Sequence, residues 1–172
     1  AIAAMAFGTQ TIPKANRIFG PGNSWVTEAK LQVAMGPSGV SIDLPAGPSE
    51  LLVIADEQAE PEFVAADLLS QAEHDSLSQV LLVSNSELLI DKVITAVLEQ
   101  LSSLPRQELA KRSLKNSKAI IVDDLATAVE VSNFYAPEHL IVNTEDPQKW
   151  LPKIRNAGSV FLGQWTPESV GD

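Results

Sequence analysis

The sequence predicts an α/β fold, in which a mostly parallel β-sheet carries helices on both faces. Short runs of consecutive apolar residues, such as "LLVIAD" and "QVLLVS", alternate with longer segments that have helical periodicity. Strands that alternate with helices of about ten or more residues are typical of βαβ units. Because the apolar runs are continuous, the strands are predicted to be buried on both faces, as in a parallel sheet.

The segment 1–48 contains the shorter elements. "AIAAMAFG" is typical of the end of a helix closed by Gly8, and "NRIFG" of a short strand. A helix is predicted over "SWVTEAKLQVAM", with Asn23 or Ser24 as its N-cap, and "GVSIDL" alternates like a strand. The turn "PAGPSE" is dense in Pro and Gly, so it is the predicted boundary between the domains 1–48 and 49–172.

From Glu50 onward the alternation is regular, and Pro61 suits the first position of a helix. In chain order, strands are predicted at "LLVIAD", "QVLLVS", "AIIVDD", "HLIVNT" and "SVFLG", and helices over 61–74, 87–101, 106–116, 125–135 and 147–156. This order predicts a Rossmann-like, doubly wound sheet.

Composition limits the classes of function. The 172 residues carry a formal net charge of -10, which repels a phosphate backbone and argues against a nucleic-acid partner. The absence of cysteine excludes disulfides and thiolate metal sites, and it fits a reducing, cytoplasmic setting. The apolar runs are too short to cross a bilayer, so no membrane partner is expected. Since the chain does not begin with Met and begins within a predicted helix, we expect a fragment of a longer protein.

Both histidines of the chain directly follow a glutamate. Gln71 and His74 lie three residues apart at the end of a predicted helix, so their side chains project on the same side. A carboxamide oxygen and an imidazole suit a borderline or hard divalent metal. The alternative is a helix-end histidine that interacts with the helix dipole, and spacing alone favours that structural interpretation.

The second pair, Glu138 and His139, lies in "APEH". Pro137 disfavours helix at Ala136, so this segment is predicted to be an elbow between a helix and a strand. If the strands are parallel, both histidines lie at helix-to-strand junctions on one edge of the sheet. A carboxylate beside an imidazole supplies two proton-transfer groups, although exposed Glu-His pairs at turns are also ordinary.

Three further positions carry weaker signals. The glycines of "FGPGN" could let backbone amides approach a phosphate near Asn23, but the segment lacks the GxGxxG spacing, and a plain strand-to-helix turn is favoured. Ser49 is either a ligand-facing hydroxyl or the end of a turn. Asp172 is a candidate carboxylate ligand, and the loop "QWTPESVG" would have to return to the opposite edge of the sheet to bring it there.

Five segments together resemble the histidinol dehydrogenase family: "KANRIFGPGNSWVTEAK", "DLPAGPSELLVIAD", "FVAADLLSQAEHD", "NFYAPEHLI" and "AGSVFLGQWTPESVGD". The resemblance runs from end to end, in order and with the spacing of the family. It implies a homodimeric enzyme that oxidises L-histidinol to L-histidine through an aldehyde, using NAD and a bound zinc (Zn2+). It also implies that this chain is the central portion of a longer subunit.

The resemblance further implies roles for particular residues. Gln71, His74 and Asp172 match zinc ligands of the family, and a fourth ligand comes from the partner subunit. Glu138 and His139 match its proton-transfer pair. The three zinc ligands and His139 are also implied to contact the substrate.

Ser49 matches another substrate contact of the family, and Asn23 matches a dinucleotide contact. The segment 1–48 is then the C-terminal part of an incomplete Rossmann-like dinucleotide-binding domain. The segment 49–172 is a second Rossmann-like domain that carries the zinc and catalytic residues.

Two other classes of function remain: a zinc-dependent α/β hydrolase and a non-catalytic α/β domain. Reduction of NAD in the presence of histidinol separates the hydrolase from a dehydrogenase. Because the resemblance places an NAD contact and an active-site histidine outside these residues, we expect the isolated chain to be inactive.

Overall fold

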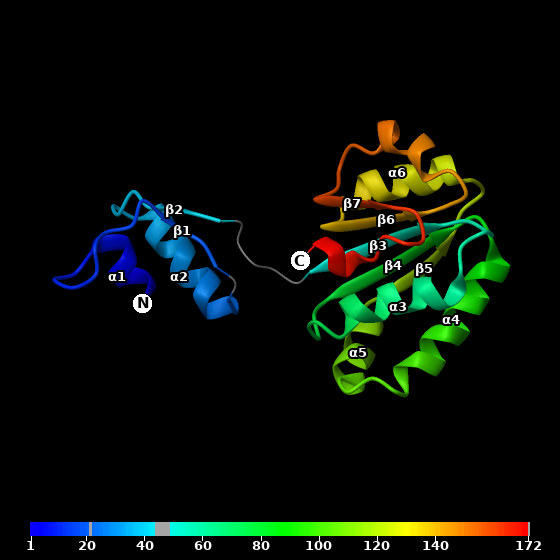
Figure 1. Ribbon diagram of the computed structural model, residues 1–172, viewed down its shortest axis with the longest axis horizontal. Coiled ribbons are helices and arrows are strands. Elements are labelled where there is room, and N and C mark those ends of the chain that lie inside the picture. The colour runs from blue at the N-terminus through cyan, green and yellow to red at the C-terminus, as the bar shows by residue number, and fades with distance from the viewer. Residues whose placement is uncertain (21, 44–48, 172) are drawn as a thin grey trace. The chain divides into compact units, whose positions relative to one another are not determined.

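The computed structural model describes residues 1–20, 22–43 and 49–171. The chain divides into two compact units, Ala1–Gly47 and Pro48–Asp172, each of which has its own hydrophobic core (Figure 1). Within the described ranges, no helix is both long enough and apolar enough to cross a membrane.

The first unit contains two helices and a small parallel sheet of two strands. Its elements are α1 (Ile2–Phe7), β1 (Arg17–Ile18), α2 (Ser24–Met35) and β2 (Ser41–Ile42). Helix α1 ends at Gly8, which has a φ of 79°, as "AIAAMAFG" predicts. Asn23 is the N-cap of α2, where its Oδ1 atom accepts a hydrogen bond from the Val26 N–H at 3.2 Å. Both strands are shorter than predicted.

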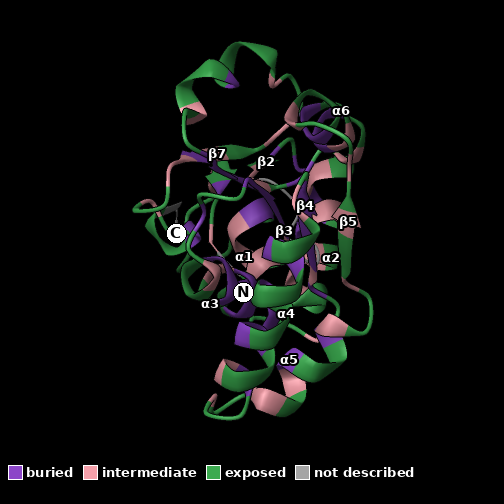
Figure 2. Cartoon of the chain, turned by 90° about the vertical axis from the view of Figure 1, so that its right-hand side faces the viewer, coloured by how far each residue is buried: buried purple, intermediate pink, exposed green. Residues whose placement is uncertain are grey.

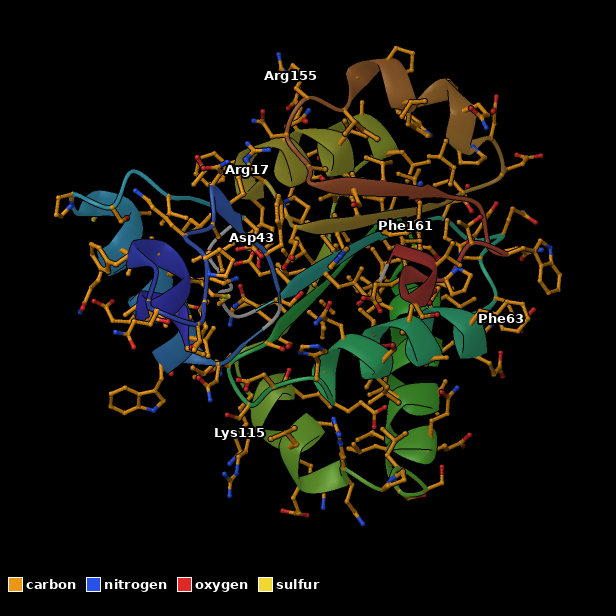
Figure 3. All side chains as sticks on the ribbon, turned by 60° about the vertical axis from the view of Figure 1, so that its left-hand side comes forward. Arg17, Asp43, Phe63, Lys115, Arg155 and Phe161 are labelled. Carbon is orange, nitrogen blue, oxygen red and sulfur yellow. The ribbon has the colours of Figure 1, made fainter. Side chains whose placement is uncertain are left out.

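A partly buried ion pair between Lys30 and Asp43 holds Gly20, next to the start of α2. The Asp43 carboxylate accepts hydrogen bonds from Lys30 Nζ at 2.6 Å and from the Gly20 N–H at 2.9 Å (Figure 3 labels Asp43). The hydrogen bond from Lys30 holds the pKa of Asp43 below its usual range. Two hydrogen bonds thus hold the connection from β1 to α2: the Gly20 N–H donates to Asp43, and Asn23 caps the helix.

The second unit is built on one five-stranded sheet in which every neighbouring pair is parallel. Its strands are β3 (Glu50–Ala55), β4 (Gln79–Ser84), β5 (Lys118–Ile121), β6 (His139–Asn143) and β7 (Ser159–Leu162), in the spatial order β5-β4-β3-β6-β7. The chain builds outward from β3 to β5, then crosses back to place β6 on the other side of β3. This topology confirms the predicted α/β fold.

Helices cover both faces of the sheet (Figure 1). They are α3 (Pro61–Ala72), α4 (Glu87–Leu101), α5 (Gln107–Leu114) and α6 (Leu125–Tyr135), followed by the 3₁₀ helices η1 (Pro147–Lys149), η2 (Leu151–Lys153) and η3 (Glu168–Gly171). Helices α3 to α5 pack on one face, and α6 packs on the other with the η1–η2 segment. Side chains along β3 alternate between the two faces of the sheet. Leu51 and Val53 belong to the core on the α3 side. Leu52 and Ile54 belong to the core on the α6 side. The inner strands β3, β4 and β6 are accordingly buried along most of their length, whereas the outer strands β5 and β7 are more exposed (Figure 2).

One predicted helix is wrong. The segment 147–156 forms the two short 3₁₀ helices η1 and η2 instead of one α-helix. Pro152 has no N–H to donate to the Gln148 carbonyl, and its ring would clash with that carbonyl, so an α-helix cannot pass through it. Helix α3 also ends at Ala72, so His74 lies in the turn that follows.

Candidate active site at the amino edge of the sheet

Ser49 joins two of the predicted site residues. Its hydroxyl lies 2.8 Å from Glu138 Oε2 and 3.2 Å from Gln71 Oε1, so its single proton can be donated to either oxygen. Ser49 directly precedes β3, Gln71 lies in the last turn of α3, and Glu138 directly precedes β6. Three junctions that are far apart in the sequence therefore meet at the amino edge of the parallel sheet.

Gln71 and His74 differ in their surroundings. Gln71 is 2% exposed, on the face of α3 that packs against the sheet, so its carboxamide is fixed by its environment. His74 is exposed, and its side chain makes no hydrogen bond to the residues that the structure describes. Glu73, between them, is half-buried at the C-cap of α3.

The segment "APEH" is an elbow, as predicted. Helix α6 ends at Tyr135, and Ala136 adopts the left-handed conformation with φ 57° and ψ 60°. An alanine there is strained, and such strain persists only where the surrounding structure holds it. The Gly158 N–H donates to the Pro137 carbonyl at 3.0 Å, and the Ser159 N–H donates to the Glu138 carbonyl at 2.8 Å.

Gly158 is the residue that allows this close contact. A Cβ atom at position 158 would lie 2.6 Å from the Glu138 carbonyl oxygen, a distance that no side chain tolerates. The sequence carries no signal for Gly158, because its role depends on a contact with a segment twenty positions earlier in the chain. A pattern of neighbouring residues in the sequence does not indicate a contact between segments so far apart.

His139 begins β6 and pairs with Leu51 of β3 and Ser159 of β7. Ile141, two positions on, belongs to the core beneath α3, and side chains two apart on a strand share a face, so His139 points to the α3 side of the sheet. Its ring lies 6.1 Å from that of Phe161, labelled in Figure 3. His139 Nδ1 is buried and has no hydrogen-bond partner in the described part of the chain.

Tyr135 ties the end of α6 to the same edge of the sheet. Its hydroxyl donates to Gln79 Oε1 at 2.7 Å, at the start of β4. Burial, and to a smaller extent the Glu50 carboxylate, raises the pKa of Tyr135 to about 12. The phenol therefore stays protonated and remains a donor, which supports the elbow from its helix side.

The chain after β7 returns along α3. The Trp165 ring contacts the Phe63 ring, with centroids 5.2 Å apart, near the start of α3. Further on, Ser70 Oγ donates to Glu168 Oε2 at 3.2 Å, in the last turns of the same helix. The segment thus runs toward the edge that holds Gln71, the direction that a role for Asp172 requires. Asp172 itself lies outside the described residues.

This return places two carboxylates close together. Burial, together with the charge of Glu168, raises the pKa of Asp67 to about 6, although a hydrogen bond from the Glu168 backbone opposes the shift. Glu168 is itself 5% exposed. The contact between α3 and η3 is therefore sensitive to pH.

The donor set at the end of α3 suits zinc in its chemistry, because Gln71 offers a fixed oxygen and His74 an accessible imidazole. Among residues 1–20, 22–43 and 49–171, no group of three histidine or acidic side chains is placed to hold a metal ion. Of the three ligands that the resemblance implies in this chain, Gln71 and His74 lie among the described residues. Asn23 belongs to the first unit, where its side chain caps α2.

Comparison with known proteins identifies close relatives. The family model described as histidinol dehydrogenase matches residues 1–172. A histidinol dehydrogenase of Colwellia psychrerythraea is 60% identical over the whole chain, which spans 40% of that protein. A putative bifunctional histidine biosynthesis protein of Photorhabdus laumondii is 58% identical, and the chain spans 21% of its length.

A solved structure agrees with these matches. The crystal structure of histidinol dehydrogenase from Elizabethkingia anophelis superposes with a TM-score of 0.95 at 52% identity, over 99% of this chain and 39% of that one. The chain therefore spans about 40% of the length of the relatives named histidinol dehydrogenase.

Proposed function

The chain belongs to the histidinol dehydrogenase family, and on that premise we propose that it forms part of an enzyme that oxidises L-histidinol to L-histidine through the aldehyde, with NAD and zinc. Within that enzyme the second unit carries the metal ligands Gln71, His74 and Asp172 and the proton-transfer residues Glu138 and His139. The first unit belongs to a dinucleotide-binding domain, with Asn23 as a contact.

One observation carries the proposal. The Ser49 hydroxyl lies within hydrogen-bonding distance of both Gln71 Oε1 and Glu138 Oε2. A substrate contact, a metal ligand and a general base, each implied separately by the resemblance, thus lie around one atom. An unrelated α/β domain has no reason to gather these side chains at one edge of its sheet.

The metal and the dinucleotide have complementary roles. Gln71, His74 and Asp172 would hold zinc, which would supply a Lewis acid to bind and position the substrate. Each of the two successive oxidations releases one hydride, for which one molecule of NAD would be the acceptor. The residues of the chain manage the protons that these oxidations release.

His139 accepts the proton of the alcohol while the carbon loses hydride, which yields the aldehyde. Its Nδ1 atom is buried and has no hydrogen-bond partner among the residues that the structure describes, so protein atoms rather than solvent surround it. Glu138 then takes a proton from water as the water adds to the aldehyde carbon. A second loss of hydride from the hydrated aldehyde produces the carboxylic acid.

The remaining assignments follow from the same resemblance. We propose a homodimer, because the family completes its zinc site with a ligand from the partner subunit. We propose a cytoplasmic enzyme whose substrate is a small molecule. The acidity of the chain, with a net charge of -10, supports the absence of a nucleic-acid partner.

A chimaera tests the proposal. The 172 residues replace the matching 40% of the Colwellia psychrerythraea histidinol dehydrogenase, to which they are 60% identical. We expect the chimaera to reduce NAD when L-histidinol is added. Glu138→Gln or His139→Asn in the chimaera should lower kcat by about a hundredfold or more, the usual effect of removing a general base.

Glu73→Gln in the same chimaera is the matched control, because it neutralises a carboxylate beside the other histidine and should leave kcat within about twofold. A folded chimaera with no histidinol oxidation would contradict the proposal. The 172-residue chain alone should turn over no histidinol, and activity in a pure sample would refute that expectation.

A further inference from the structure

A cavity of about 280 Å³ lies at the carboxyl edge of the second unit's sheet. Its lining comes from Gln58 after β3, from Asn143 to Glu145 at the end of β6, and from Gln164 and Trp165 after β7. Strands β3 and β6 are neighbours, but the connections that leave them run in opposite directions. In open α/β sheets such a crevice is where ligands bind. The site around Ser49 lies at the other edge and does not use it.

Two side chains in the wall of this cavity lack partners. Asn143 is 3% exposed and Thr144 is 7% exposed. Neither Asn143 Nδ2 nor Thr144 Oγ1 has a hydrogen-bond partner among the described residues. The great majority of buried polar side-chain atoms in proteins are hydrogen-bonded. Both atoms lie beneath the cavity surface, so a polar ligand supplies the missing partners only once these side chains rotate toward it.

The surroundings of the cavity restrict the charge of such a ligand. Asp56 is buried, and its carboxylate accepts hydrogen bonds from the backbone N–H groups of Gln58 at 3.1 Å and Glu145 at 2.8 Å. These bonds fix the loops after β3 and β6 against each other. With the Glu145 side chain also in the lining, two carboxylates stand at this edge. They disfavour an anion and can accept hydrogen bonds from hydroxyl groups.

Trp165 adds an aromatic surface to the lining. Its side chain is 77% exposed, yet its ring is held by Phe63 at a centroid distance of 5.2 Å and an interplanar angle of 61° (Figure 3 labels Phe63). An exposed ring with a restrained orientation is suited to stacking against a planar ligand.

We propose that this cavity binds an uncharged ligand of the nucleoside class. The base stacks on Trp165, polar atoms of the ligand hydrogen-bond with Asn143 and Thr144, and ribose hydroxyls donate to Glu145. A phosphorylated ligand is disfavoured by the two carboxylates. The proposal is independent of the proposed function, because the two sites lie at opposite edges of the sheet.

Binding of adenosine to the 172-residue chain tests this proposal, with equilibrium dialysis for affinity and ¹⁵N NMR for location. We expect saturable binding that shifts the amide signals of Asn143, Thr144 and Glu145, and weaker binding of AMP. Trp165→Ala should weaken adenosine binding by about tenfold or more, the usual contribution of one stacked base.

Trp25→Ala is the matched control, since Trp25 is 82% exposed and lies in the first unit, and it should leave the affinity unchanged. Thr144→Val, which keeps the shape of the side chain and removes its hydroxyl, should weaken binding even if Trp165→Ala is misfolded. The proposal is overturned by no binding at millimolar adenosine, by equal effects of the two tryptophan variants, or by AMP binding more tightly than adenosine.

Discussion

Ser49 has one hydroxyl proton and two acceptors within reach, Gln71 Oε1 and Glu138 Oε2. It can donate to only one of them at a time. The other oxygen then keeps capacity to accept from a ligand or to coordinate a cation. When the Gln71 oxygen is engaged elsewhere, the hydroxyl is available to Glu138 alone. The Ser49 hydroxyl thus links the hydrogen bonding of Gln71, in the last turn of α3, to the hydrogen bonding of Glu138, in the elbow.

The free energy of unfolding should depend on pH through the carboxyl group of Asp67. Its pKa in the folded chain, raised to about 6 by burial and by Glu168, lies above that of an unfolded aspartate. The folded state therefore binds the proton more tightly, and the free energy of unfolding falls as pH rises from about 4 to about 6. Below that window Asp67 is protonated in both states and this penalty is absent.

Asp67→Asn should remove the penalty while it keeps an acceptor for the Glu168 backbone. After allowance for solvent screening, we expect the variant to be more stable by about 1 kcal/mol at about pH 7, with a flatter profile through the window. Urea unfolding followed by circular dichroism at several pH values measures this. The exposed Asp91→Asn should retain the wild-type profile, and equal profiles for all three proteins would exclude Asp67 as the source.

At the scale of elements, the elbow between α6 and β6 is held from two sides. The Tyr135 hydroxyl bonds to Gln79 on the helix side, and the Gly158 and Ser159 amides bond to the Pro137 and Glu138 carbonyls on the strand side. These contacts maintain the left-handed Ala136 between them. The position of the Glu138 carboxylate is therefore determined by three segments that meet at one corner of the sheet.

Gly158→Ala should disturb this corner, because its Cβ atom would lie 2.6 Å from the Glu138 carbonyl oxygen. We expect a loss of about 1–3 kcal/mol in the free energy of unfolding, as for other overpacked sites. Differential scanning calorimetry or urea titration measures it. Ser159→Ala, at an exposed neighbouring position, should change stability by less than about 0.5 kcal/mol. A wild-type Tm for Gly158→Ala would show that the corner can relax.

At the scale of the whole molecule, the two units differ in the size of their cores. In the first unit the buried apolar cluster consists of Ala6, Ile18, Val33 and Val40. The second unit has a separate apolar cluster on each face of its sheet. Small cores provide little stability, so the first unit should open more readily than the second.

Native-state hydrogen exchange measures this difference. Amides of β3 and β4 should exchange about a hundredfold or more slowly than those of α2, because they open only when the larger unit unfolds. The same separation should persist in low concentrations of denaturant. Equal protection in α2 and β3 would instead indicate a single cooperative unit.

The sequence predicted the elements whose ends carry local signals. The bounds of α2, α4 and α6 agree with the predictions, because Asn23, Ser86 and Asp124 cap these helices through their own side chains. The predicted helix over 147–156 is wrong because Pro152 interrupts it, so only two short 3₁₀ helices form there. The link from Ser49 to Glu138 spans 89 positions, and no local pattern carries that information.

The sheet ends at β5, beyond which no further strand of the described chain is paired, and Lys118, Ala119 and Ile121 are exposed there. An outermost strand presents backbone groups that can recruit a strand from another molecule. In concentrated samples, aggregation of the isolated chain is therefore expected to begin at this margin. The positive charge of Lys118 opposes the stacking of identical copies in register, which makes that position the natural place to engineer better solubility.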